Sequence, residues 1–176
     1  MPEPCFVGDQ GLYAQKHNPF MYFDDVRLNR QRCQQSVVPL TELQKDIEAN
    51  SLPNFLFITP NLCNDSHECG LDVADAWLAD TMATLTPALD NTGEPYLVVV
   101  LFDEAKRPDD ILGKLLESDG GHIPVVLYSP FVKKGFEDNT RYNHYSLLKT
   151  ISAAWDLSYL GHAADNENVL ITAPWK

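Results

Sequence analysis

The run Tyr96-Leu97-Val98-Val99-Val100-Leu101-Phe102 carries the clearest structural signal in this chain. Its residues are apolar and mostly β-prone, and they do not alternate with polar ones, which is typical of a strand covered on both faces. Two shorter apolar runs, at residues 55–58 and 124–128, are predicted to be strands of the same sheet. A polar stretch over 105–121 separates the last two strands.

Helical patterns lie between and after these strands. Thr41 is expected to open a helix with Gln44 as its capping-box partner, and this helix ends before Pro53. Asp72 is the expected N-cap of a second helix, which Gly93 ends, and a third helix follows Asn143. The apolar faces expected of the second and third helices are Val73, Trp77, Leu78 and Leu85, and Leu147, Leu148, Ile151 and Trp155.

This order of elements predicts the fold class. Strands and helices alternate, so we expect an α/β fold with a mostly parallel sheet and flanking helices. Residues 1–35 are rich in turn formers and are expected to be irregular. No linker composition divides the 176 residues, which predicts a single domain over 1–176.

The charge balance limits the possible partners. The chain has 13 Lys and Arg against 25 Asp and Glu, a net charge of −12. Nucleic acid is therefore not expected as a partner, because phosphate backbones need clustered cations. No apolar run approaches the ~18 residues of a membrane span, so no integral membrane association is expected.

The four cysteines suggest a compartment. Their simplest pairing is Cys5–Cys33 and Cys63–Cys69, and the alternative is four unrelated buried thiols. An even number with tight spacing favours an oxidising compartment. The first residues, MPEPCFVGDQ, have neither the basic start nor the apolar run of a signal peptide.

Asp103 and Glu104 form the sharpest candidate site. They end the most apolar strand, and ligands of open α/β sheets bind beyond the carboxyl ends of the strands. Two carboxylates suit a divalent cation, whose identity the sequence leaves open. The alternative is a pair of solvated acids in a loop.

Three histidines are further candidates. His67 lies in the loop between Cys63 and Cys69, where an imidazole can hold a phosphoryl oxygen or donate a proton. His122 follows two glycines, which suits close presentation to a ligand, and His17 precedes a proline-restricted turn. Surface or packing roles are the alternatives for all three, and His144 is expected to be a cap or packing residue. Asn64-Asp65-Ser66 is a glycosylation sequon that we expect to be silent.

Several segments together resemble one family. They are Lys16–Asp25, Leu52–Asn61, Asn64–His67, Phe102–Glu104 and Tyr142–Ile151. Their order is similar to that in the phosphoesterase family of secreted acid phosphatases and phospholipases C, within the alkaline-phosphatase-like superfamily. The resemblance covers roughly residues 1–163.

The resemblance implies metal-dependent phosphoryl transfer in an alkaline-phosphatase-like fold. By position, the metal pair of the family falls on Asp103 and Glu104. The residues bordering the phosphate fall on Asn64, Asp65 and His67, and the pocket is also lined by His17 and His122. The implied activity is an acid-phosphatase-type phosphoric ester hydrolase acting on a small phosphoester. The alternatives are a phospholipase C acting on phospholipid, and a non-catalytic remnant that binds metal or a phosphorylated ligand.

The chain also departs from the family pattern. Family members begin with a half-domain that supplies a Glu-Asn metal pair and a Ser or Thr nucleophile, and no segment before His17 resembles either. The chain therefore resembles the C-terminal half of such an enzyme, either a truncated gene product or a natural remnant. A missing N-terminal half is then an expected partner. An extracellular or periplasmic location is expected, with the signal peptide outside this chain.

Overall fold

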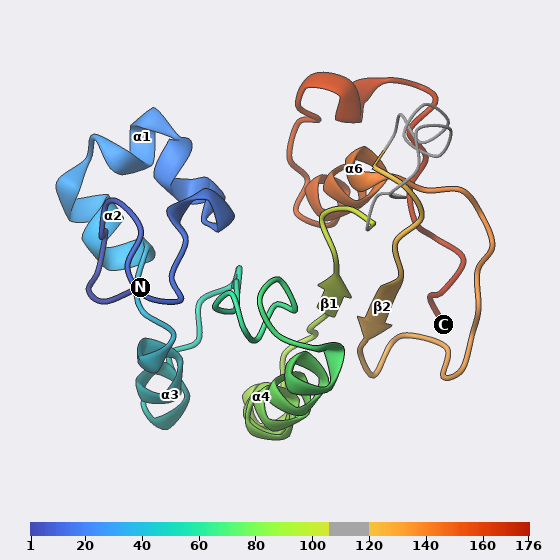
Figure 1. The fold of residues 1–176 in the computed structure, drawn as a ribbon. Coiled ribbons are helices and arrows are strands. Elements are labelled where there is room, and N and C mark those ends of the chain that lie inside the picture. Colours follow the sequence, from blue (N-terminus) through green and yellow to red (C-terminus); the bar gives the residue numbers. More distant parts are fainter. Residues whose placement is uncertain (106–119) are drawn as a thin grey trace. The chain divides into compact units, whose positions relative to one another are not determined.

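The computed structural model describes residues 1–105 and 120–176 (Figure 1). These residues form two compact units, Met1–Glu94 and Pro95–Lys176. Most of the predicted polar stretch over 105–121 lies outside the described residues. The expectation of a single domain over 1–176 stays a prediction.

The N-terminal unit begins with short helices. They are η1 (Gln15–His17), η2 (Pro19–Tyr22), α1 (Asp24–Arg27) and α2 (Arg30–Ser36). The prediction of an irregular segment over 1–35 is therefore wrong for its second half. The Asn29 side-chain oxygen accepts a hydrogen bond from the Arg32 N–H, which caps α2.

A small core holds these helices together. It consists of Met21, Val26, Cys33 and Val37. Cys33 is bonded to Cys5, so a disulfide ties the start of the chain to α2. The second disulfide joins Cys63 and Cys69, and no cysteine is free. Both predicted pairings are confirmed.

Two longer helices follow, α3 (Thr41–Glu48) and α4 (Leu71–Thr92). Both are close to their predicted positions, but neither predicted cap forms. Leu40 is the N-cap of α3, and Gln44 donates to the Glu48 carboxylate instead. Gly70 precedes α4, with Asp72 inside the first turn. Gly93 ends α4 as predicted, in a left-handed conformation (φ 71°) that favours glycine.

The strand predicted over 55–58 is not formed. Among the described residues no strand pairs with it, and an apolar run without a ladder partner has no reason to remain a strand. Phe55 and Phe57 are exposed, and the Phe57 and Phe20 rings pack in a T-shaped arrangement with centroids 5.4 Å apart.

The C-terminal unit is built around a two-stranded sheet. The strands β1 (Val98–Leu101) and β2 (Val125–Tyr128) lie side by side in Figure 1 and pair antiparallel. The predicted mostly parallel sheet is therefore wrong for these strands, although the described elements still combine helices with a sheet. An apolar run indicates that a strand can be buried, but it does not encode the direction of its partner. Neighbouring side chains in β2, Val125 and Val126, are 45% and 57% exposed, so neither face is fully covered.

The helix α6 (His144–Ala154) begins where the sequence predicts. The Asn143 side-chain oxygen caps it by accepting from the Ser146 N–H at 2.9 Å. Its buried residues are Ser146 and Ser152, whereas Leu148 and Trp155 of the predicted apolar face are exposed. The C-terminal segment contacts this helix, because the Ile171 N–H donates to the Thr150 hydroxyl. Within the described ranges, no helix has the length and hydropathy needed to cross a membrane.

Candidate active site

A disulfide-closed loop holds part of the predicted site. The Asn61 side-chain oxygen accepts from the backbone N–H groups of Cys63 and Asn64, both at 3.0 Å. Ser66 adopts a positive φ of 70°, which costs free energy in a residue other than glycine. The Cys63–Cys69 bond closes the loop around this residue. The loop is thus held in one conformation by several local restraints.

The loop brings together three residues that the sequence singled out. His17 Nδ1 lies 3.1 Å from Asp65 Oδ2, although the two residues are 48 positions apart in the sequence. The backbone N–H of His67 donates to Asp65 Oδ1 at 2.8 Å. The rings of His17 and His67 have centroids 5.5 Å apart. We call His17, Asp65 and His67 the histidine cluster.

Both imidazoles of the histidine cluster face a carboxylate through the same nitrogen. His17 Nδ1 faces Asp65, and His67 Nδ1 lies 3.1 Å from Glu68 Oε1. Glu68 was not among the predicted site residues, although its position between Cys63 and Cys69 could have indicated that it lies near His67. A carboxylate at Nδ1 favours the proton on that nitrogen, so Nε2 is the nitrogen left for a ligand. Within the described part of the chain, neither Nε2 atom makes a hydrogen bond.

The remaining predicted substrate contacts also lie in this loop. Asn64 is half-buried, and its backbone N–H is bound by Asn61. Both oxygens of Asp65 are engaged by protein groups, one by His17 and one by His67. Direct contact of Asn64 and Asp65 with substrate stays a prediction.

The second group of predicted residues lies in the C-terminal unit, where β1 ends. Asp103 and Glu104 are both exposed, and the Glu104 N–H donates to Asp103 Oδ1 at 2.8 Å. His144 Nε2 lies 2.7 Å from the Asp103 carbonyl oxygen, so the first residue of α6 holds the turn after β1. The prediction that His144 is a cap or packing residue did not include this contact, because no local sequence pattern links residues 41 positions apart.

His122 belongs to the same unit and is exposed. The two glycines before it have φ values of 79° and 80°, a conformation that few other residues adopt. The tight backbone expected at this position is therefore present. The expected cleft shared by Asp103, Glu104, His67 and His122 stays a prediction, because His67 belongs to the other unit.

Asp103 and Glu104 suit a cation in chemistry but do not complete a site for it. Carboxylate oxygens are ligands that hard divalent ions prefer, and such ions take about six or more oxygens. In residues 1–105 and 120–176, no group of three or more His, Cys, Asp or Glu side chains is placed to hold an ion. The pair therefore supplies part of a coordination shell.

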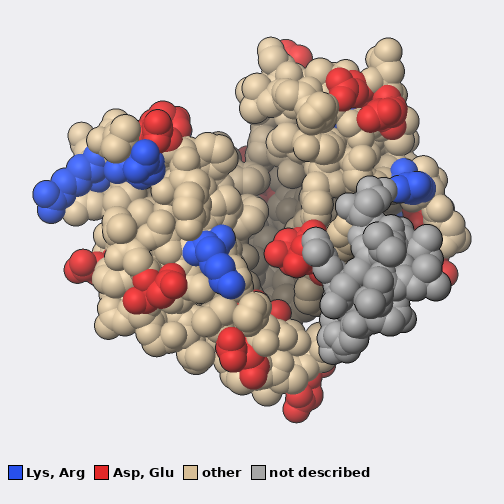
Figure 2. Space-filling view, turned by 45° about the horizontal axis from the view of Figure 1, so that its top comes forward, with Lys and Arg blue, Asp and Glu red and all other residues tan. Residues whose placement is uncertain are grey.

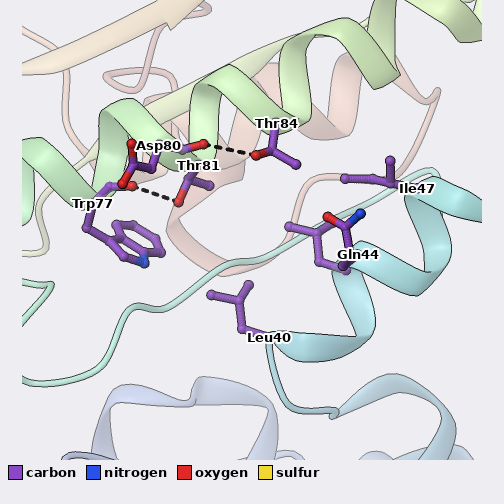
Figure 3. Close-up of a pocket in the computed structure, with 8 residues that line it drawn as sticks. Leu40, Gln44, Ile47, Trp77, Asp80, Thr81 and Thr84 are labelled. Carbon is purple, nitrogen blue, oxygen red and sulfur yellow. Dashed lines mark hydrogen bonds between the residues drawn. The ribbon is translucent and has the colours of Figure 1, made fainter.

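A cavity of about 250 Å³ lies elsewhere in the N-terminal unit, between α3 and α4 (Figure 3). It is lined by Leu40, Leu43, Gln44, Ile47, Trp77, Asp80, Thr81 and Thr84. The hydroxyls of Thr81 and Thr84 donate to carbonyls of their own helix, as the dashed lines show. Among these described lining residues Asp80 alone is charged, and it would repel an anion. None of the predicted site residues lines this cavity.

The visible surface carries mostly acidic charge, and pKa shifts occur at residues outside the predicted site. Figure 2 shows acidic side chains scattered over the visible face with few Lys and Arg among them. Hydrogen bonds from Thr140 lower the pKa of Asp138, and burial together with the bond to Asp138 raises the pKa of Tyr142. These two residues lie in the segment before α6 and are not among the predicted site residues.

Comparison with known proteins identifies the family. The sequence profile of the phosphoesterase family matches residues 5–158, so the chain belongs to the phosphoesterase family. A probable acid phosphatase of Kluyveromyces lactis is 37% identical over 163 residues, covering 90% of this chain and 36% of the relative. An acid phosphatase of Aspergillus fumigatus is 34% identical over 173 residues, covering 96% of this chain and 35% of the relative.

A more distant relative has a different name. The phosphatidylinositol-3-phosphatase of Mycobacterium tuberculosis is 29% identical over 159 residues, covering 90% of this chain and 47% of the relative. The chain thus spans about a third of the length of the two acid phosphatases and about half of this third relative. No solved structure shows significant similarity to the chain.

Proposed function

We propose that the chain carries part of the active site of an acid-phosphatase-type hydrolase of phosphoric esters. The observation that carries the proposal is the histidine cluster, in which two imidazoles lie side by side with Nδ1 of each facing a carboxylate. The names of the relatives, acid phosphatases at 34–37% identity, support the reaction class. The substrate is a small phosphate monoester.

The roles of the residues follow from this arrangement. In the charged form, each imidazole offers its Nε2–H to a phosphoryl oxygen, and such charge-assisted hydrogen bonds are the stronger kind. One of the two can also give its proton to the oxygen of the leaving group, as a general acid does. Histidine suits both roles because its charge changes between about pH 5 and 8.

Asp103 and Glu104 are proposed to hold a divalent cation in the full active site. When bound, such an ion neutralises charge that develops on the transferring phosphoryl group. The exposed pair and its turn, held by His144, support the assignment. His122 is proposed to line the same pocket, and the complete enzyme to have an alkaline-phosphatase-like fold. The remaining ligands are expected from other parts of a complete enzyme.

An extracellular or periplasmic location is proposed with this function. Both disulfides support it, because such bonds persist in oxidising compartments and are rare in the cytosol.

Binding of inorganic phosphate to the 176-residue chain tests the proposed site. We expect phosphate at about pH 5.5 to shift the imidazole NMR signals of His17 and His67 in a saturable way. His17→Gln and His67→Gln should each weaken binding about tenfold, the loss expected for one charged hydrogen bond. His162→Gln is the matched control, because His162 also faces a carboxylate, that of Asp165 at 2.9 Å, but lies outside the cluster. Equal effects of phosphate on His162 and His17 would contradict the proposal.

Turnover separates the catalytic candidates. We expect slow or undetectable hydrolysis of p-nitrophenyl phosphate by this chain, far below the enzyme median of ~10 s⁻¹, because no matched motif supplies the nucleophile of the family.

A phosphate monoester on a lipid head group is a second candidate substrate, favoured by the name of the Mycobacterium relative. Preference for p-nitrophenylphosphorylcholine would instead indicate a phospholipase C. Phosphate binding without any turnover would indicate a non-catalytic remnant.

A further inference from the structure

Asp65 has the most constrained side chain in the histidine cluster. Its Oδ2 lies 3.1 Å from His17 Nδ1, and its Oδ1 accepts the His67 N–H at 2.8 Å. The side chains of His17 and Asp65 are only 26% and 16% exposed. Each carboxylate oxygen of Asp65 therefore contacts one protein partner, and water competes little for either contact.

The backbone beneath Asp65 is also held. The Asp65 N–H donates to the Asn61 carbonyl at 2.9 Å, and the Glu68 N–H donates to the Leu62 carbonyl at 2.7 Å. The Cys63–Cys69 bond closes the loop on both sides of Asp65. Because the carboxylate sits on such a restrained loop, it can set the orientation of the His17 ring that it contacts.

Two other histidine–carboxylate pairs of the described residues differ in this respect. His67 and Glu68 are neighbours in sequence with side chains 49% and 57% exposed, and His162 and Asp165 are 73% and 47% exposed. Exposed pairs of this kind contribute little, because water competes and side-chain entropy is lost. Of the three pairs, only His17–Asp65 is both long-range in sequence and largely removed from water.

We propose that Asp65 is a positioning residue that fixes the tautomer and orientation of the His17 imidazole. Asp65 accepts the Nδ1–H, so neutral His17 presents Nε2 as its unprotonated nitrogen, ready to take or return a proton. This assignment deepens the proposed function, because it gives Asp65 a role through His17 instead of a direct contact with substrate. A carboxylate facing a phosphate directly would repel it. A carboxylate bound to Nδ1 of an imidazole instead supports the contact of that imidazole with the phosphate through Nε2.

The tautomer can be measured directly in the 176-residue chain. Long-range ¹H–¹⁵N NMR spectra distinguish Nδ1–H from Nε2–H in neutral histidine, and we expect His17 at pH 8 to carry its proton on Nδ1. Free imidazole side chains of histidine favour Nε2–H, so the expected signal differs from that of an unpartnered ring. A wild-type His17 protonated mainly on Nε2 would overturn the proposal without any variant being made.

Asp65→Asn should reverse the tautomer. If the amide oxygen keeps the His67 N–H, the amide NH₂ faces His17 Nδ1 and donates to it, so the ring proton moves to Nε2. Asp165→Asn is the matched control, since it alters a similar but exposed pair and should leave the His17 signals unchanged. Intact mass and circular dichroism verify that the disulfides and the fold survive. A folded Asp65→Asn variant with an unchanged His17 tautomer would also overturn the proposal.

The phosphate titration keeps the two proposals apart. A wild-type Nδ1–H tautomer that reverses in Asp65→Asn, together with no effect of inorganic phosphate, supports the positioning role and rejects the phosphate site. Saturable phosphate binding with His17 protonated on Nε2 supports the site and rejects the positioning role.

Discussion

At the scale of single residues, neighbouring acids at the end of a strand are ambiguous. Asp103 and Glu104 are exposed, and the Glu104 N–H is bound by the neighbouring carboxylate. Asp24 and Asp25 are also adjacent, but each is paired with an arginine, Arg27 and Arg32 respectively. Among the described residues, arginines already neutralise the second pair, so the first pair is the one to test for a cation.

Divalent ion binding tests this difference. We expect Mn²⁺ to bind the chain weakly, in about the millimolar range of sites with few charged ligands. Asp103→Asn and Glu104→Gln should each weaken the binding about tenfold or more, because each removes one anionic oxygen donor. Isothermal titration calorimetry measures this, with the double variant Asp24→Asn/Asp25→Asn as the matched control. Unchanged binding in both test variants would refute the metal assignment.

At the scale of elements, α6 depends on an asparagine that serves two structures at once. The Asn143 side-chain oxygen caps the helix at the Ser146 N–H, and its amide nitrogen donates to the Asn168 side-chain oxygen at 2.7 Å. Asn168 is almost fully buried. The cap therefore also satisfies a polar group that water does not reach.

Asn143→Ala should consequently lower the free energy of unfolding by more than the loss of a helix cap alone would. We expect destabilisation of roughly 2–4 kcal/mol, about 1 for the cap and about 1–3 for the buried oxygen left without its donor. Asn29→Ala is the control, because Asn29 caps α2 through one exposed hydrogen bond and should cost only about 1 kcal/mol. Hydrogen exchange of the amides in each helix measures both changes. Equal costs would show that the Asn168 contact contributes nothing.

At the scale of the whole molecule, both disulfides lie in the N-terminal unit, Met1–Glu94. Cys5–Cys33 closes a separation of 28 residues and enters the core beside Met21, whereas Cys63–Cys69 closes a separation of 6. The first bond therefore restricts the unfolded chain more, and the second mainly shapes the loop of the histidine cluster.

Removing each bond separately should reveal these different roles. From loop entropy alone, we expect Cys5→Ala/Cys33→Ala to lower the free energy of unfolding of this unit by about 3.6 kcal/mol, and Cys63→Ala/Cys69→Ala by about 2.2 kcal/mol. Only the second pair of substitutions should disturb the His17 and His67 NMR signals in protein that remains folded. Denaturant unfolding and imidazole spectra measure both effects. A larger stability loss from the shorter loop would contradict the assignment of roles.

Features that depend on a few neighbouring residues were predictable from the sequence. The start of α6 after Asn143, the end of α4 at Gly93 and the Cys63–Cys69 loop are all as predicted, because each is determined within one or two turns of chain. The family resemblance is likewise confirmed by the profile match and the relatives. Of the candidate residues, His17, Asp65 and His67 lie together, and their role in a phosphate site stays a prediction.

Features that depend on distant segments needed the structure. The antiparallel pairing of β1 with β2, the absence of a strand at 55–58 and the burial of Ser146 and Ser152 depend on which segments meet, and no local pattern encodes that. The contacts of Asp65 with His17 and of His144 with the Asp103 carbonyl join residues more than 40 positions apart. Such contacts form only when the fold closes a long loop, so their geometry belongs to the tertiary structure.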